Sequence, residues 1–128
     1  MGILHAASRD GDTERVKQLL DDGAPVDAKD EQDCTALLWA GLRGHTEVVK
    51  LLLDKGASVD EKAKHGWTAT ALVRASRQGH MEVVKLLLDK GASVDEKDQD
   101  GDTALLMASK YGRTEAVKLL LDKGASVD

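Results

Sequence analysis

The chain has 128 residues, with 23 acidic and 18 basic side chains and a net charge of −5 at pH 7. Nucleic-acid binders normally carry a basic excess, so this balance argues against that class. No apolar run reaches the roughly 18 residues of a membrane span, no signal-peptide pattern precedes His5, and a single cysteine excludes an intrachain disulfide. We therefore expect one domain over residues 1–128, without membrane association, in the cytoplasm or in recombinant cytosolic expression.

One sixteen-residue segment recurs along the chain. Residues 47–62 read EVVKLLLDKGASVDEK, and residues 82–97 are identical. A looser copy occupies residues 14–29, and a further copy starts at Glu115 and differs only at Ala116. Such a period predicts stacked units, each of which buries its apolar face on its neighbours. The units are expected at about 1–29, 30–62, 63–97 and 98–128.

Glycines divide each unit into two short helices. Glycine is favoured just past a helix end because it adopts the left-handed conformation without Cβ strain. The first glycine of each unit precedes the second by twelve residues. The eight glycines are Gly11, Gly23, Gly44, Gly56, Gly79, Gly91, Gly112 and Gly124.

The two helices of a unit differ in character. The first contains small pairs such as Ala40-Gly41 and Ala75-Ser76, which allow neighbouring helices to approach closely. The second is apolar on nearly all sides, as in residues 48–53 (VVKLLL), which predicts burial between layers. An acidic turn such as residues 98–102 (DQDGD) follows and protrudes from the stack.

Residues 30–60 (DEQDCTALLWAGLRGHTEVVKLLLDKGASVD) and 98–128 resemble ankyrin repeats in their period, in the Gly-His step and in the LLLxxGA segment. The resemblance covers essentially the whole chain. It implies an all-α ankyrin-repeat solenoid of four helix-turn-helix repeats with protruding β-turns. Sixteen-residue identity between neighbours is typical of an engineered consensus-type chain, similar to designed ankyrin-repeat binders; a recent natural duplication gives the same pattern.

The chain departs from the family pattern at several positions. The family's T-P-L-H becomes Thr-Ala-Leu-Leu or Thr-Ala-Leu-Val in the last three units, and only His5 keeps the family histidine. Asp33 stands where the turn normally has glycine, and aspartate tolerates the left-handed region. Two extra residues near Thr68-Ala69 are expected to lie in the protruding third turn, where an insertion costs little.

No residue pattern indicates catalysis or a metal site. The acidic run at Asp98 lacks the glycine and glutamate spacing of an EF-hand loop. His45 and His80 sit in the Gly-His step, which favours a structural role, and no metal-ligand spacing of Cys or His occurs. Cys34 is expected in an exposed turn without a basic neighbour, as an ordinary free thiol. We expect no enzyme activity and no cofactor.

Candidate binding residues follow from the differences between units. Positions spaced i, i+3 and i+4 on the first helix share one face, and the resemblance implies that this face lines a concave groove. All three aromatic residues fall at variable positions, and Trp, Tyr and Arg are enriched at binding hot spots. The predicted contact residues are Cys34, Trp39, Leu42, Arg43, His65, Trp67, Arg74, Arg77, Gln78, Asp100, Asp102, Met107, Lys110 and Tyr111.

The leading functional hypothesis is a non-enzymatic module that binds a partner protein, acidic with apolar patches, through the groove and the turn tips. One alternative is an engineered repeat scaffold without a specific partner. Another is a sensor of a small ligand or oligonucleotide, which the acidic balance disfavours. The last helix, from Glu115, has no polar capping substitutions, so the final layer is expected to expose apolar surface and to fray or to stack end to end on another molecule.

Overall fold

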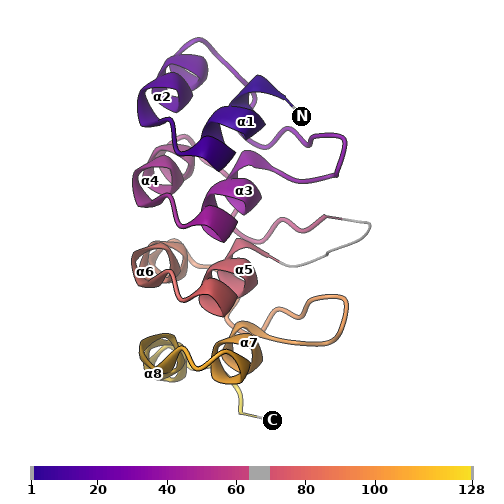
Figure 1. Ribbon diagram of the computed structural model, residues 1–128, viewed down its shortest axis with the longest axis vertical. Helices are drawn as coiled ribbons and strands as arrows, with labels where there is room; N and C mark the ends of the chain where they lie inside the picture. Colours follow the sequence, from indigo (N-terminus) through magenta and orange to yellow (C-terminus); the bar gives the residue numbers. More distant parts are fainter. Residues whose placement is uncertain (1, 64–69, 128) are drawn as a thin grey trace.

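The computed structural model describes residues 2–63 and 70–127, and all regular structure in these two ranges is helical. Helices lie in pairs, one pair in each repeating unit, and the pairs stack along the long axis of the molecule (Figure 1). The helices are α1 (Ile3–Asp10), α2 (Thr13–Asp21), α3 (Ala36–Arg43), α4 (Thr46–Asp54), α5 (Ala71–Gln78), α6 (Met81–Asp89), α7 (Ala104–Lys110) and α8 (Thr114–Asp122).

The helices form two columns. The first helices α1, α3, α5 and α7 make one column, the second helices make the other, and the described turns between units project from the first column away from the second (Figure 1). This is the all-α repeat solenoid that the sequence predicts. No helix in the described ranges is long and apolar enough to cross a membrane.

Local side chains determine where the first helices begin and end. The hydroxyl of Thr35 accepts a hydrogen bond from the backbone N–H of Leu38 at 3.3 Å, and Thr70 and Thr103 cap α5 and α7 in the same way. These caps satisfy an N–H group that has no partner inside the helix. At the other end, Gly44 adopts the left-handed conformation with φ 73°. Threonine caps therefore define where α3, α5 and α7 begin, and left-handed glycines define where α1, α3 and α5 end.

The core is a continuous layer of aliphatic side chains between the stacked pairs. Val48, Val49 and Leu52 of α4 are fully buried, as the apolar pattern of the second helix predicts. The first helices approach closely where residues are small. A Cβ placed on Gly41 would lie only 3.3 Å from the Cβ of Ala71, so a larger side chain there would push α3 and α5 apart.

Polar links join the first helices of neighbouring units. In each link, a side chain from the turn after one first helix contacts a backbone carbonyl near the end of the preceding first helix. These carbonyls have no partner inside their own helix, so the link satisfies them. The histidines of the Gly-His step therefore have the structural role that the sequence favours. The links are His45 Nε2 to Arg9 O (2.8 Å), His80 Nε2 to Leu42 O (3.1 Å) and Arg113 Nε to Arg77 O (3.1 Å).

Candidate functional site

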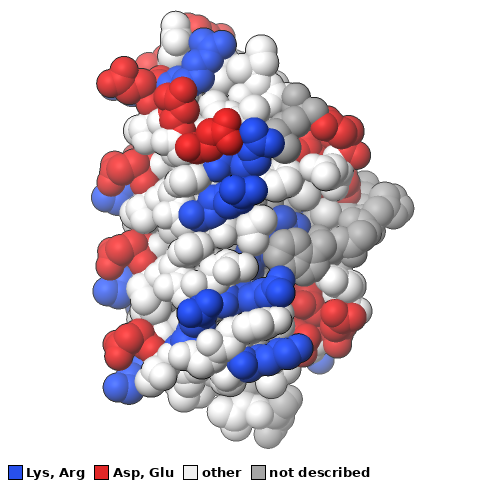
Figure 2. All heavy atoms as spheres, viewed as in Figure 1, with Lys and Arg blue, Asp and Glu red and all other residues white. Residues whose placement is uncertain are grey.

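The first-helix face consists of the residues at the three variable positions of each first helix, together with the residue that ends it. Its exposed members are Asp10, Arg43, Gln78, Lys110 and Tyr111, and Arg9, Trp39, Leu42 and Arg77 are half-buried. Figure 2 shows basic side chains in a band over the column of first helices, with acidic side chains along both margins. The exposed part of this face is therefore polar and, from α3 onward, basic, with a few apolar surfaces between the charges.

Two predicted contact residues of this face are buried. Arg74 is 2% exposed and Met107 is 7% exposed, because both side chains pack against their own and neighbouring layers. Burial lowers the pKa of the Arg74 guanidinium, an effect that nearby Cys34 and Asp30 oppose. A partner on the surface would not reach these two side chains, so we leave them out of the proposed contact set.

The expected exposure of Cys34 is wrong. The residue is 7% exposed, and its Sγ atom lies 3.9 Å and 4.0 Å from the two terminal nitrogens of Arg74. The turn folds Cys34 inward because Asp30 Oδ1 accepts a hydrogen bond from the Cys34 backbone N–H at 3.0 Å. The thiol thus has a basic neighbour that sequence distance concealed, 40 residues further along the chain.

Trp39 is tied to the turn that precedes its own helix. Its indole N–H donates to Asp30 Oδ2 at 2.7 Å, and its ring is half-buried against the core. Burial of Asp30 opposes ionisation, but hydrogen bonds from the Cys34 backbone, the Trp39 indole and the Gln32 backbone together hold the pKa of the carboxyl below its usual value. Trp39 therefore has an internal role in addition to any contact with a partner.

Two cations lie close to the Tyr111 ring. The Arg77 guanidinium carbon is 5.0 Å from the ring centroid, and Lys110 Nζ is 5.7 Å from it. Arg77 also donates a hydrogen bond to the Tyr111 hydroxyl at 3.2 Å, which fixes the relative positions of the two side chains. The ring is 40% exposed, so this cluster presents an aromatic surface flanked by positive charge.

Of the contact residues predicted at the tips of the last two turns between units, the structure describes only those of the turn before α7. Asp100 and Asp102 lie in the described turn before α7, where Asp98 Oδ1 accepts hydrogen bonds from both of their backbone N–H groups at 2.9 Å. The three carboxylates come within 4.8 Å of one another, but that grouping belongs to the turn's own hydrogen bonding. His65, Trp67 and the insertion at residues 68–69 lie outside the described residues.

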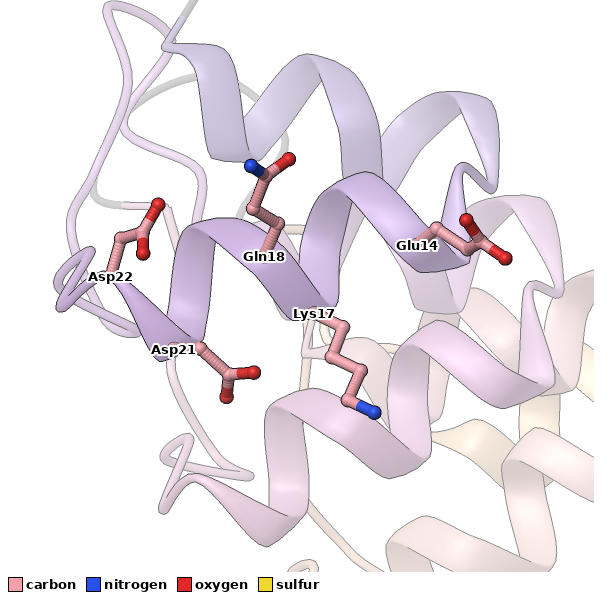
Figure 3. A pocket seen from close by; sticks show the side chains of 5 residues that line it. All are labelled: Glu14, Lys17, Gln18, Asp21 and Asp22. Atoms are coloured by element: carbon pink, nitrogen blue, oxygen red, sulfur yellow. The ribbon is translucent and has the colours of Figure 1, made fainter.

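The largest depression among the described pockets lies elsewhere, on the outer side of α2. It measures about 440 Å³ and is open to solvent. Figure 3 shows that its side chains fan out from the helix instead of converging on a point. A catalytic set needs a nucleophile or acid–base pair held within hydrogen-bond reach, and this surface does not provide one. Its lining residues are Glu14, Lys17, Gln18, Asp21 and Asp22.

Sequence reasoning missed two residues that shape the face. Asp30 positions Trp39 through a hydrogen bond. Its place at the start of a turn, four residues before Cys34, could have indicated this role, because aspartate often accepts hydrogen bonds from the backbone of a turn that it begins. Arg113 occupies the place that His45 and His80 hold in earlier units, so the Gly-His pattern itself marks it as an exception.

A comparison with known families agrees with this architecture. A family model described as ankyrin repeats (3 copies) matches residues 2–63 and 61–128, which together cover nearly the whole chain. No curated protein matches the chain.

Proposed function

This chain belongs to the ankyrin-repeat family, and from that premise we propose that it is a non-enzymatic module that binds a partner protein through the first-helix face and the turn tips. Ankyrin repeats generally mediate protein–protein interaction. The partner would be acidic with apolar patches, because the face that would meet it is basic with apolar surfaces between the charges.

One observation carries this proposal: within the last three first helices, the residues that are constant between units are buried, whereas several residues that vary are exposed on one face. Ala40 and Ala75 are identical and fully buried, whereas Arg43 and Gln78, which occupy matching positions on the same helices, differ and are exposed. Variation at constant packing positions would cost stability, but variation at the exposed positions of this face changes what the protein can contact at little cost in stability.

A site-specific crosslinking experiment tests the proposal. A photoreactive phenylalanine derivative replaces Gln78 on the first-helix face, or Lys118 on the exposed side of α8 as a matched control. We expect a discrete partner protein to crosslink at position 78, with saturable dependence on its concentration, and not at position 118. Equal crosslinking at both positions, or none at either, would favour a scaffold without a specific partner.

A specific observation also supports self-association of the 128-residue chain through its last layer. Leu106 of α7 is 50% exposed, whereas Leu38 and Val73, which occupy the same position in earlier units, are 1% and 2% exposed. Val127, which lines the same depression as Leu106, is exposed, and Leu121 of α8 is exposed as well. This surface has the composition of an internal junction between layers, so burying it against a second copy would be favourable.

Sedimentation across a range of concentrations tests this second proposal. We expect the sedimentation coefficient to rise with concentration for the unmodified chain and to stay constant for Leu106→Lys. The matched control is Gln78→Lys, which adds the same charge on the first-helix face. A strictly monomeric unmodified chain would refute self-association and leave the partner-binding proposal unaffected.

A further inference from the structure

Three segments that form the first-helix face contain positive charge and no negative charge. Residues 36–45, 71–80 and 104–113 hold no Asp or Glu, although the whole chain has more acidic than basic residues. The band of basic side chains in Figure 2 lies over these segments, between two margins that carry the acidic residues. The basic residues of the three segments are Arg43, Arg74, Arg77, Lys110 and Arg113.

We propose that the part of the face formed by α5 and α7 is a carboxylate-binding site, and that it takes an acidic segment of the partner's chain. This inference rests on the proposed function, and it specifies which part of the face contacts the partner and that the contact is made by binding carboxylates. We call the residues Arg77, Lys110, Tyr111 and Arg113 the cationic cluster.

The cationic cluster is held in place before any partner arrives. Arg77 is fixed by its hydrogen bond to the Tyr111 hydroxyl (3.2 Å) and by its position over the ring. Arg113 is fixed by its hydrogen bond to the Arg77 backbone carbonyl (3.1 Å). Arginine side chains that are already ordered lose less entropy when they bind, and their planar donors match a carboxylate.

The charges of Lys110 and Arg113 are available to a partner. Among the described residues, no acidic side chain forms an ion pair with Lys110 or Arg113 within 4.0 Å. Lys110 is exposed, and its Nζ lies 5.7 Å from the Tyr111 centroid. A carboxylate that approaches the ring would therefore meet cations already positioned around it.

In the first layer of the face, by contrast, the positive charge is already paired with a carboxylate. Arg9 Nε donates to Asp10 Oδ1 at 2.9 Å, so its charge is already compensated. The same hydrogen bond is the main reason that the pKa of Asp10 lies below its usual value, with smaller contributions from nearby Arg43 and His45. The positive potential thus increases along the face from α1 toward α7, which gives an acidic partner a preferred position.

The layout of the charges favours a protein segment over a nucleic acid. Packed helices lie about 8–10 Å apart, so cations on α5 and α7 suit carboxylates at about that spacing, such as residues i and i+7 of a helix. Exposed acidic residues border the band on both sides, for example Asp100 at the turn tips and Glu82 and Glu115 on the second helices. A wide polyanion would be repelled by these margins, whereas a single narrow segment would avoid them.

Fluorescence anisotropy with a defined probe tests the inference. The probe is a fluorescein-labelled helical peptide with glutamates at seven-residue spacing and leucines between them, and the control peptide has glutamine in place of each glutamate. We expect only the glutamate peptide to bind. Raising the salt from about 0.01 M to about 0.15 M should weaken its binding, because screening shortens the reach of exposed charges.

Charge-reversal variants locate the site. Lys110→Glu should weaken binding of the glutamate peptide roughly tenfold, whereas Lys118→Glu, with the same change in net charge, should change it by less than about twofold. Lys110→Ala should show an intermediate loss. Unfolding curves of each variant check that the stack is intact.

Several outcomes would overturn the inference. These are equal binding of the two peptides, no binding of either, equal effects of Lys110→Glu and Lys118→Glu, or stronger binding of a single-stranded oligonucleotide than of the glutamate peptide. If a partner still crosslinks at position 78 and its binding is unchanged by Lys110→Glu, the carboxylate site is wrong while the protein-binding function stands. If crosslinking at position 78 also fails, the proposed function is wrong as well.

Discussion

Replacing Trp39 by phenylalanine should destabilise the second unit through one hydrogen bond. The indole N–H donates to Asp30 at 2.7 Å, and phenylalanine keeps an aromatic ring, smaller than the indole, but has no donor. A hydrogen bond to a charged group contributes about 1.5–3 kcal/mol, and we take the lower part of that range because Asp30 is partly exposed. Trp39→Phe should therefore cost about 1–2 kcal/mol, a fall in Tm of roughly 4–8 °C.

The loss of stability caused by Trp39→Phe should become smaller at acid pH. The pKa of Asp30 is lower in the folded chain than in the unfolded chain, so its stabilisation is fully present above the unfolded value, near about 4. The stabilisation is lost as pH falls through the still lower folded value. Urea unfolding at pH 7 and again below pH 4 should show the difference between Trp39→Phe and the unmodified chain shrinking in acid.

A control comes from the fourth unit, which repeats the same turn without an indole. Asp98 accepts the two backbone hydrogen bonds, but Met107 stands at the position of Trp39. Met107→Leu, a change of similar volume, should show no comparable dependence on pH. Equal stability of Trp39→Phe and the unmodified chain at pH 7, or a difference that does not shrink in acid, would refute the assigned role of the hydrogen bond.

Three further predictions concern packing, turns and the thiol. Leu52→Ala, at a fully buried position, should cost about 3–5 kcal/mol in urea unfolding, whereas a cost below about 1 kcal/mol would contradict the burial. Gly44→Ala should destabilise more than Gly56→Ala: both glycines have positive φ, but only at Gly44 would the new Cβ meet a side chain, His80 at 2.5 Å. Cys34 should react with a thiol reagent much more slowly in the folded chain than in urea, and equal rates would show that it is exposed.

The fold could be predicted from the sequence because the signals repeat. Three of the four first helices have a threonine cap, every unit has a glycine at the end of its first helix or one residue beyond its cap, and the apolar pattern of the second helix recurs, so local preferences and packing agree from unit to unit. The left-handed conformation of Asp33, with φ 63°, was likewise predictable from its place in the turn. The end of α7 was less predictable: the helix stops at Lys110, Tyr111 is its C-cap, and Gly112 follows.

The candidate site was harder to predict because accessibility depends on the neighbouring layer. Arg74 and Arg77 are both arginines on one helix, yet Arg74 is buried beside Cys34 and Arg77 is half-buried beside Tyr111. Helical periodicity places both near one face, but which of them a partner can touch is decided by residues more than 30 positions away. The residue pattern of one repeat unit does not show which of its side chains the neighbouring unit covers.

These contacts mean that binding and stability are not separable at every variable position. Trp39 and Arg77 hold other side chains in place, so their replacement changes both the surface and the free energy of unfolding. Arg43 and Gln78 are exposed, and no hydrogen bond or ion pair to another described side chain involves them, so their replacement should change the surface alone. A loss of partner binding caused by the second group therefore reports on contact, whereas a loss caused by the first group needs an unfolding measurement beside it.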